Sequence, residues 1–471
     1  MNRFELELQR GVMKSVHLIC ALGLALAIQS GLLVASESPT KTSRTGFTHV
    51  RSLGDIDEYM LDANGLDVLV MPDHSAPVVT FNVTYHVGSR NEVTGTTGAT
   101  HILEHLMFKG SSGFNDPKGN SVKQYLERVG GSYNATTSLD CTIYFATVGI
   151  ESLEGYIAIE ADRMRHLWLR ESDRQSEMTV VRNEFERGKN APNRILGEEV
   201  AAAAYQALPY HHDTIGWRSD IEHVPIQKVK AFYDTYYWPN NATIIVVGDI
   251  EPAAALALVR KYYGAYPRSP APIPAIYTEE PEQAGARRVI VKRPGEQGSI
   301  LIAHKVSTAR APDQAALAVL DGILGDGKNS RMYRRLVDQG LALDVSAYTD
   351  SRYDLSLHQL YASVAPGITH AAVEAAILED IVKLQTEGVT GAEVERVQQQ
   401  TLAEQSFKRD GTFGIASELS FWIGVGDWTL YQRFPEQIAK VTPADVQRAA
   451  QTYLNEDQST TGWLVPVSAK K

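Results

Sequence analysis

A five-residue motif, His101-Ile-Leu-Glu-His105, constrains this 471-residue chain more than any other segment. It lies inside residues 97–110, a run whose composition predicts a helix. Side chains four apart share a helix face, so His101 and His105 can offer two imidazoles to one metal ion, with Glu104 on the same side. The order H-x-x-E-H reverses the H-E-x-x-H motif, but five residues alone fit a hydrogen-bonded histidine pair on a polar helix face about as well.

A third ligand is needed to decide between these two interpretations. A catalytic zinc usually takes three protein ligands and keeps a fourth position for water. Residues 177–188 form a second predicted helix with carboxylates at Glu177 and Glu184, which lie two helical turns apart and share a face. One carboxylate can reach a metal while the other lies behind it. The alternative is that both are solvated charges on an amphipathic helix.

These features resemble the pitrilysin family of zinc peptidases, which includes insulin-degrading enzyme and the mitochondrial processing peptidase. In that family H-x-x-E-H is followed by E-x6-E about eighty residues later, and here 78 residues separate His105 from Glu184. The resemblance implies that His101, His105 and Glu184 bind zinc. It also implies that Glu104 is the general base and that Glu177 is a carboxylate supporting the ligands.

Two further segments carry the resemblance. Residues 130–144 resemble the substrate-binding strand of the family, and residues 233–249 resemble the strand that closes its first domain. The resemblance places Asn134 and Ala135 near the scissile bond. An exposed strand edge can take up an extended peptide as a further strand, through backbone hydrogen bonds that are indifferent to side chains. Without the resemblance, Asn134 is better interpreted as a turn residue.

The residue types of the motif predict the chemistry. Zinc held by two neutral imidazoles and one carboxylate keeps a net positive charge, lowers the pKa of bound water to about 7 and polarises a scissile carbonyl. Glu104 can take the proton of that water and pass it to the leaving amine. Glu177 can hydrogen-bond a ligand histidine or steer Glu184. The sequence thus predicts a zinc-dependent endopeptidase with Glu104 and Glu177 in catalytic roles.

One departure from the family pattern concerns the later half of the chain. The family usually supplies an Arg and a Tyr there, in a segment resembling L-R-x-x-x-G-L-A-Y, to bind the substrate carbonyl. The matching run here has Val337 and Leu343 at those positions, and neither side chain can donate a hydrogen bond. Arg334, Arg335 and Tyr348 lie nearby but out of register.

The resemblance offers two ways to restore these missing groups. In the favoured one, the chain is the metal-bearing subunit of a heterodimer, and a homologous partner without a zinc motif supplies Arg and Tyr across a shared chamber. In the other, the chain is a self-sufficient homodimer that uses nearby side chains. A third hypothesis is a non-catalytic scaffold or peptide-binding protein of the same fold. Such a chain would be expected to lack part of the metal set, whereas this one keeps all of it.

The first 36 residues predict a secretory signal peptide. Lys14 precedes an almost uninterrupted apolar stretch at residues 16–28, which small residues follow. The stretch is short for a transmembrane anchor, so the sequence predicts export, to the periplasm if the source is bacterial. Cys20 would leave with this leader, and Cys141 is expected to be a buried small side chain.

The rest of the chain is predicted to form two homologous α/β domains, an α+β fold class. Residues 45–266 alternate strand-like and helical runs, and residues 286–471 repeat that order of elements without H-x-x-E-H. Each domain is expected to be a mostly antiparallel sheet packed with helices, and the resemblance implies that the two form half of a clam shell. Residues 267–285 begin with four prolines in eight residues and continue with acids, which predicts a stiff, solvated linker.

Charge and motifs exclude several other functions. The formal net charge is −11, which repels polyphosphates, and no basic block interleaved with aromatics indicates nucleic-acid binding. Residues 322–329 match a phosphate-binding loop except at Asn329, where Ser or Thr would bind magnesium. They also follow a helical run instead of a strand, which argues against nucleotides. The expected cofactor is therefore Zn²⁺, and the expected partners are peptides and a homologous subunit, with no membrane contact after leader removal.

Overall fold

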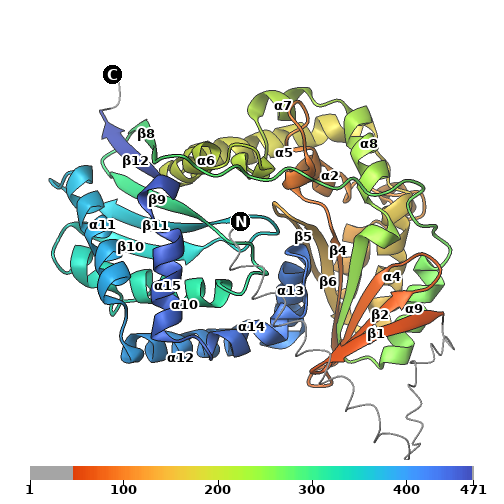
Figure 1. The fold of residues 1–471 in the computed structure, drawn as a ribbon. Helices are drawn as coiled ribbons and strands as arrows, with labels where there is room; N and C mark the ends of the chain where they lie inside the picture. Colours follow the sequence, from red (N-terminus) through yellow and green to blue (C-terminus); the bar gives the residue numbers. More distant parts are fainter. Residues whose placement is uncertain (1–45, 469–471) are drawn as a thin grey trace, which may run out of the picture. The chain divides into compact units, whose positions relative to one another are not determined.

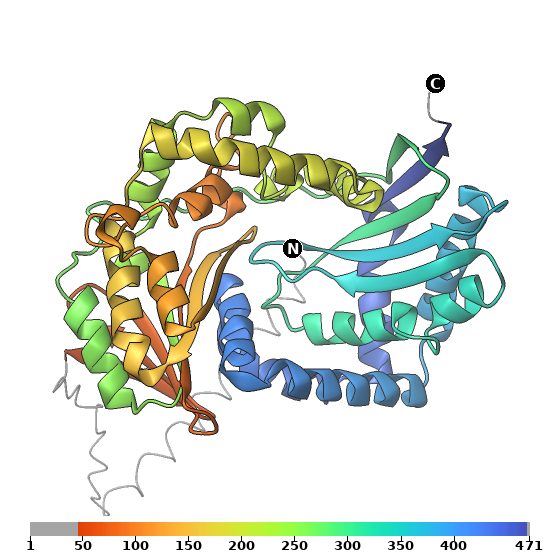
Figure 2. The ribbon, with the colours of Figure 1, turned by 180° about the vertical axis from the view of Figure 1, so that it is seen from behind.

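A computed structural model describes residues 46–468 of the chain, and the predicted signal peptide lies outside this range. Two mixed β-sheets, each packed with helices, form two domains (Figures 1 and 2). This confirms the predicted α+β class with two domains, whereas the residue limits given above for each domain stay a prediction. Within the described range, no helix combines the length and the apolar character that crossing a membrane requires.

The first sheet has seven strands in the order β1-β2-β3-β7-β4-β6-β5. Neighbouring strands are antiparallel except β3 and β7, which are parallel. The strands are β1 (Phe47–Leu53), β2 (Ile56–Leu61), β3 (Asp67–Pro72), β4 (Val78–Tyr85), β5 (Ser132–Thr137), β6 (Thr142–Gly149) and β7 (Ala242–Gly248). Strand β5, which contains Asn134 and Ala135, therefore lies at an edge of the sheet.

The second sheet has five strands in the order β10-β11-β9-β12-β8. Its strands are antiparallel except for the pair β12 and β8. They are β8 (Arg287–Pro294), β9 (Ser299–Val306), β10 (Ala342–Thr349), β11 (Ser356–Val364) and β12 (Ser459–Val467). Both sheets are thus mostly antiparallel, as the sequence predicts, and the prolines of residues 267–274 lie between them in a segment without helix or strand.

Helices cover both sheets. Those that precede the second sheet in the chain are α2 (Ala99–Leu106), α3 (Val122–Val129), α4 (Ile150–Arg165), α5 (Glu171–Lys189), α6 (Pro192–Ala204), α7 (Arg218–His223), α8 (Ile226–Tyr236) and α9 (Pro252–Tyr263). The later ones are α10 (Gln314–Gly325), α11 (His370–Glu387), α12 (Gly391–Lys408), α13 (Gly411–Gly424), α14 (Leu430–Ile438) and α15 (Pro443–Tyr453). Helix α2 carries the H-x-x-E-H motif and is shorter than the run 97–110 predicted for it.

One helix of each domain packs on the sheet of the other domain. Helix α6 packs on β8, β9 and β12, and α13 packs on β4 and β7, as Figures 1 and 2 illustrate. Leu196 and Val200 of α6 lie in one buried cluster with Leu301 and Leu464 of the second sheet. A Cβ at Gly462 would lie 2.4 Å from Cγ2 of Val200, so the strand needs glycine for this close approach.

The contact of α13 with the first sheet is partly polar. Strand β4 turns Thr80, Asn82 and Thr84 toward α13, and all three are buried. Asn82 Nδ2 donates to Ser420 Oγ over 2.8 Å, and the hydroxyls of Thr80 and Thr412 share a hydrogen bond of the same length. The buried face of β4 is therefore matched to α13 by hydrogen bonds as well as by shape.

Cys141, which directly precedes β6, is buried as expected from the sequence. Burial raises the pKa of its thiol to about 12. The thiol lies against the end of α13, where a Cβ at Gly424 would stand 2.7 Å from Sγ. The second domain therefore covers this cysteine.

The linker is not uniformly solvated, which corrects the sequence prediction. The carboxylate of Glu280 is fully buried and forms an ion pair with Lys305 of β9, over 2.7 Å. It also accepts hydrogen bonds from the backbone N–H groups of Gln206, Ala207 and Leu208, at 2.7, 2.9 and 3.0 Å. A run of acids suggests solvation on average, but it cannot reveal that one carboxylate has a buried cation and three amides as partners.

We expect Glu280→Ala to destabilise the protein by about 3–5 kcal/mol, because the substitution leaves a buried ammonium without its partner. Unfolding in urea measures this, with Glu279→Ala, an exposed neighbour, as the matched control. Burial acts to raise the pKa of Glu280, but the backbone N–H of Gln206 and the Lys305 ammonium outweigh it and bring the pKa below its ordinary 4.5. The stabilisation is then fully present above pH 4.5 and declines as the pH falls through the folded-state pKa. Equal effects of both variants would contradict this.

Candidate metal centre

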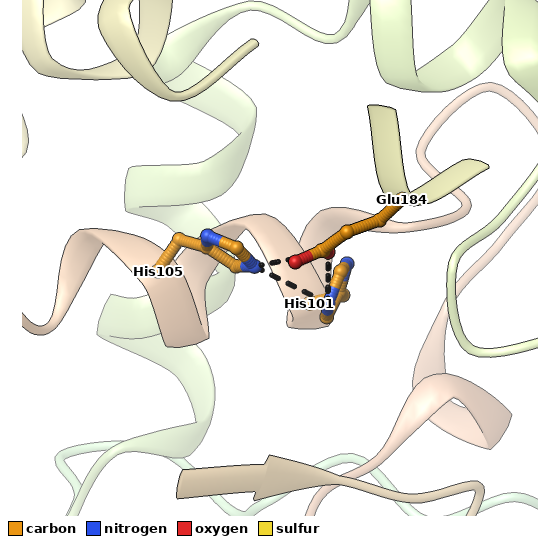
Figure 3. Close-up of side chains that lie close together, drawn as sticks. All are labelled: His101, His105 and Glu184. Atoms are coloured by element: carbon orange, nitrogen blue, oxygen red, sulfur yellow. Dashed lines mark hydrogen bonds and ion pairs between the residues drawn. The ribbon is translucent and has the colours of Figure 1, made fainter. Parts of the chain in front are cut away.

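The face of α2 that is turned away from the core carries the polar residues of the motif. Ile102, Leu103 and Leu106 are buried in the main core of the first domain. The side chains of His101 and His105 therefore point away from that core, and Glu184 of α5 approaches them from a separate helix (Figure 3). The hydrophobic spacing of α2 alone decides which face can bind a metal.

The start of α2 is fixed by a residue that the sequence analysis does not single out. Glu92 accepts hydrogen bonds from the backbone N–H groups of Gly98 and Thr100, at 2.8 and 2.7 Å. Burial raises the pKa of Glu92 to about 8, although these hydrogen bonds act to lower it. Gly98 has φ +85°, and a Cβ there would lie 2.4 Å from the carbonyl oxygen of Ile215. The helix can therefore begin only where the chain has a glycine.

Three ligand atoms form a triangle of the size that zinc requires. His101 Nε2 and His105 Nε2 lie 3.3 Å apart, and each lies 3.5 Å from Glu184 Oε2 (Figure 3). A tetrahedral zinc with ligands at about 2.05 Å holds them roughly 3.4 Å from one another. Among the residues that the structure describes, this is the one group of three His, Cys, Asp or Glu side chains that could hold a metal ion.

The electrostatics of His101 suit metal binding. Burial, with a smaller contribution from the neighbouring His105, lowers the pKa of His101 to about 4. The imidazole is therefore neutral near pH 7, the form that binds a metal. Its side chain is only 17% exposed, in agreement with this burial.

A supporting carboxylate and a lysine lie behind His105. Glu177 Oε2 lies 3.0 Å from His105 Nδ1, the ring nitrogen opposite the one in the triangle. The other oxygen of Glu177 forms an ion pair with Lys109. Burial acts to raise the pKa of Glu177, but Lys109 and His105 together outweigh it, so the net shift is downward. Glu177 is thus held as an anion that can orient His105, and Lys109 is a residue that the sequence analysis missed.

Glu104 is held by a residue of the edge strand. Its Oε2 accepts a hydrogen bond of 2.5 Å from Thr137 Oγ1, at the end of β5. Burial raises the pKa of Glu104, although this hydrogen bond acts in the opposite direction. A carboxylate with a raised pKa is a better proton acceptor for a nearby water. No spacing rule links Thr137 to the motif, so sequence reasoning did not find it.

The two predicted substrate residues lie on opposite faces of β5. Ala135 lines a cavity of about 550 Å³ together with His101, Glu104 and Glu184. Asn134 alternates with it along the strand and lines a different cavity. The structure brings the side chain of Ala135 next to the metal ligands, whereas that of Asn134 points away from them.

Comparison with known proteins agrees with this geometry. The family model described as Insulinase (Peptidase family M16) matches residues 67–216, and the one described as Peptidase M16 inactive domain matches residues 223–401. The zinc protease PqqE of Helicobacter pylori is 30% identical over 408 residues, which cover 86% of this chain and 91% of that protein. The chain belongs to peptidase family M16.

Two further proteins extend the comparison of this M16 chain. The crystal structure of a protease from Helicobacter pylori aligns with a TM-score of 0.83 at 30% identity, covering 88% of this chain and 100% of that one. The probable mitochondrial-processing peptidase subunit beta of Arabidopsis thaliana is 24% identical over 419 residues, 86% of this chain and 77% of that protein. The resemblance to the pitrilysin family, which is M16, is thereby confirmed, and several relatives are named zinc proteases.

We expect Glu177→Gln to weaken the zinc affinity of this M16 chain by about ten- to a hundredfold, because the amide is a poorer partner for His105. Competition with a fluorescent zinc chelator measures the affinity. Glu171→Gln is the control, since Glu171 lies at the exposed start of the same helix and pairs with Arg174 and Gln175, away from the histidines. Equal zinc affinities of the Glu177 variant and the unsubstituted protein would rule out this role.

Proposed function

We propose that this M16 chain is a zinc-dependent endopeptidase that cleaves short or unfolded peptides. His101, His105 and Glu184 hold the metal, Glu104 is the general base, and Glu177 orients His105. The observation that carries the proposal is the triangle of His101, His105 and Glu184, with sides of 3.3 and 3.5 Å that match a zinc site. The carboxylate of Glu104 lines the same cavity.

The residues of the chain divide the chemistry among them. Zinc, when bound, lowers the pKa of a water ligand and polarises the scissile carbonyl. Glu104 accepts the proton of the attacking water and delivers it to the leaving amine. Thr137 keeps Glu104 turned toward the cavity, and Glu177 fixes the orientation of His105.

Strand β5 supports the choice of extended peptides as substrates. It lies at the edge of the first sheet, and Ala135 and Thr137 on one of its faces lie beside the catalytic groups. A peptide added along this edge would be held by main-chain hydrogen bonds, which any sequence can supply. Only a segment free of its own secondary structure can add in this way, so short or unfolded chains are the substrate class.

We expect Glu104→Gln to retain zinc and to lower kcat by about a hundred- to ten-thousandfold, the usual contribution of a general base. Metal analysis and the cleavage of a quenched, unstructured peptide measure the two properties. Glu186→Gln, with an exposed carboxylate on α5, is the matched control. Turnover by the Glu104 variant at the unsubstituted rate would refute the assignment.

A non-catalytic scaffold is the second candidate. One observation favours it, since the model that matches residues 223–401 is described as an inactive domain. That match lies outside the metal centre, and the second half of the sequence contains no H-x-x-E-H. The complete ligand set in the first domain makes the peptidase the better conclusion.

We further propose that the chain acts as the metal-bearing subunit of a heterodimer. The metal cavity is lined by residues between His101 and Ile215, all from the first domain. At the two family positions of the second domain, Val337 packs against the core and Leu343 is 55% exposed. Arg335 pairs with Glu379, and Tyr348 lines another cavity. A homologous partner chain would supply the family's Arg and Tyr, whereas a homodimer would have to use nearby side chains such as Arg187 and Arg194, which line the metal cavity.

Purified alone, the protein should bind one zinc and cleave peptides poorly. Adding a homologous chain that lacks the zinc motif but carries the Arg and Tyr segment should raise kcat/KM by about a hundredfold or more, the usual value of an oxyanion donor. The same partner with both residues replaced by Ala is the control. Full activity of the protein alone would contradict the heterodimer and favour the homodimer.

The location of the protein is also a proposal. The predicted leader at residues 1–36 indicates export, to the periplasm in a bacterium. An exported peptidase for unfolded peptides would act on protein fragments outside the cytosol.

A further inference from the structure

The face of the first sheet opposite the metal centre holds a second cavity beside the edge strand. Along β5, Ala135 and Thr137 face the metal helix, so Asn134 and Thr136 face the other side. Both Asn134 and Thr136 are exposed and line a cavity of about 370 Å³, and Thr136, at the strand edge, also borders the metal cavity. The two cavities are therefore separated only by the edge of the sheet.

Aromatic side chains from both domains line this second cavity. These side chains are Phe145 of β6 in the first sheet, and Phe413 and Phe421 of α13, the helix of the second domain that packs on this sheet. We call these three residues the aromatic groove. Ile143 and Val425 add further apolar surface beside them.

The groove is open to a ligand. Phe413 and Phe421 are 46% and 43% exposed, although most other residues of α13 are buried. They lie eight residues apart with the exposed Ser417 between them, so the three side chains form one stripe of the helix. The rings of Phe413 and Phe145 lie 4.6 Å apart, which joins the stripe to the sheet. Two half-exposed phenylalanines in one cavity provide apolar area that burial by a ligand would stabilise.

The class of ligand follows from the pleat of a substrate peptide that adds as a strand beside β5. Successive side chains of a strand point to opposite faces, and a peptide beside β5 continues the pleat of the sheet. If one of its residues faces the metal cavity, both of its neighbours in sequence face the aromatic groove. We propose that the groove, through Phe413 and Phe421, binds a large apolar side chain of the substrate at a position next to the residue that faces the metal. This inference rests on the proposed function, since it requires a peptide on the edge of β5.

The proposal gives the second domain a direct part in selecting substrates. The main-chain hydrogen bonds along β5 cannot distinguish sequences, whereas an apolar cavity discriminates by the size of the side chain. The charged groups at one end of the groove are already paired, Asp140 with Tyr210 and Arg352 with Asp350. An apolar side chain such as Leu or Phe therefore matches the groove better than a charged one.

Peptide binding to the zinc-loaded Glu104→Gln protein tests this without turnover. Labelled, unstructured peptides with an Ala-rich host sequence carry a single Leu, moved one position at a time, and fluorescence anisotropy gives each Kd. We expect Leu to improve affinity roughly tenfold or more over Ala at alternate positions of the peptide, and not at the positions between them. In a Phe413→Ala/Phe421→Ala protein this preference should disappear, while the affinity for the all-Ala host stays within about twofold. Phe407→Ala is the matched control, because Phe407 is 80% exposed and lies outside the groove.

Each outcome decides one point. A Leu preference that survives the double substitution, or an equal loss of affinity for all peptides, overturns the proposal, as does the absence of any peptide binding. If the double substitution instead dissociates an oligomer in sedimentation while the preference persists, the groove is a subunit contact. Turnover by the unsubstituted protein is measured separately. A groove-dependent Leu preference without turnover, even when the homologous partner chain is added, would reject the peptidase and leave the peptide subsite standing.

Discussion

Hydrogen bonds between β4 and α13 supply the polar face of the first sheet with partners from the second domain. Asn82 and Thr80 are buried, and Asn82 Nδ2 donates to Ser420, whereas Thr80 pairs with Thr412 and also with Thr147 of β6. A polar group that α13 covered without pairing it would cost about 1–3 kcal/mol. The sheet that ends in β5 is therefore complete only when the second domain is packed on it. An apolar face would have allowed α13 to shift along the sheet, whereas paired hydroxyls and amides fix α13 in one position on it.

The packing of α6 on the second sheet affects α5, the other helix of the candidate metal centre. Glu184 lies near the end of α5, and α6 begins after only two residues, 190 and 191. Leu196 and Val200 of α6 are buried in the second sheet, so the end of α5 is held from that side. The two histidines are thus positioned by the first domain, while the carboxylate that completes the triangle depends on both. A domain without a metal motif thus helps to position one of the three candidate ligands.

The parts of the centre that depend on helix geometry alone could be predicted from the sequence. A spacing of four places His101 and His105 on one face, and a spacing of seven aligns Glu177 with Glu184. That Glu184 and not Glu177 lies beside both histidines was indicated only by the family resemblance, because both carboxylates share that face. Contacts between distant segments, such as that of Thr137 with Glu104, follow no local pattern and were not predicted.

The fold, like the candidate metal centre, could be predicted from the sequence only in part. The order of strands and helices and the break at the prolines could be read from periodicity and composition, so the two-domain class was predicted correctly. The alternation of Thr80, Asn82 and Thr84 with apolar residues is typical of a strand with one solvated face, yet that face is buried under α13. Burial of a polar face depends on a partner far along the chain, and Glu280 of the linker is a second case of the same effect.

Cys141 gives this arrangement an observable. It is the only cysteine within residues 46–468, and its sulfur lies beneath Gly424 at the end of α13. A thiol with a pKa of about 12 under a packed helix is nearly inert to alkylating reagents. Cys141 borders the second cavity but is only 4% exposed, so movements of α13 away from the sheet would expose it further. Such local openings have their own free energies, below or equal to that of global unfolding. The modification rate of this single sulfur atom would therefore report how often the contact between α13 and the sheet opens.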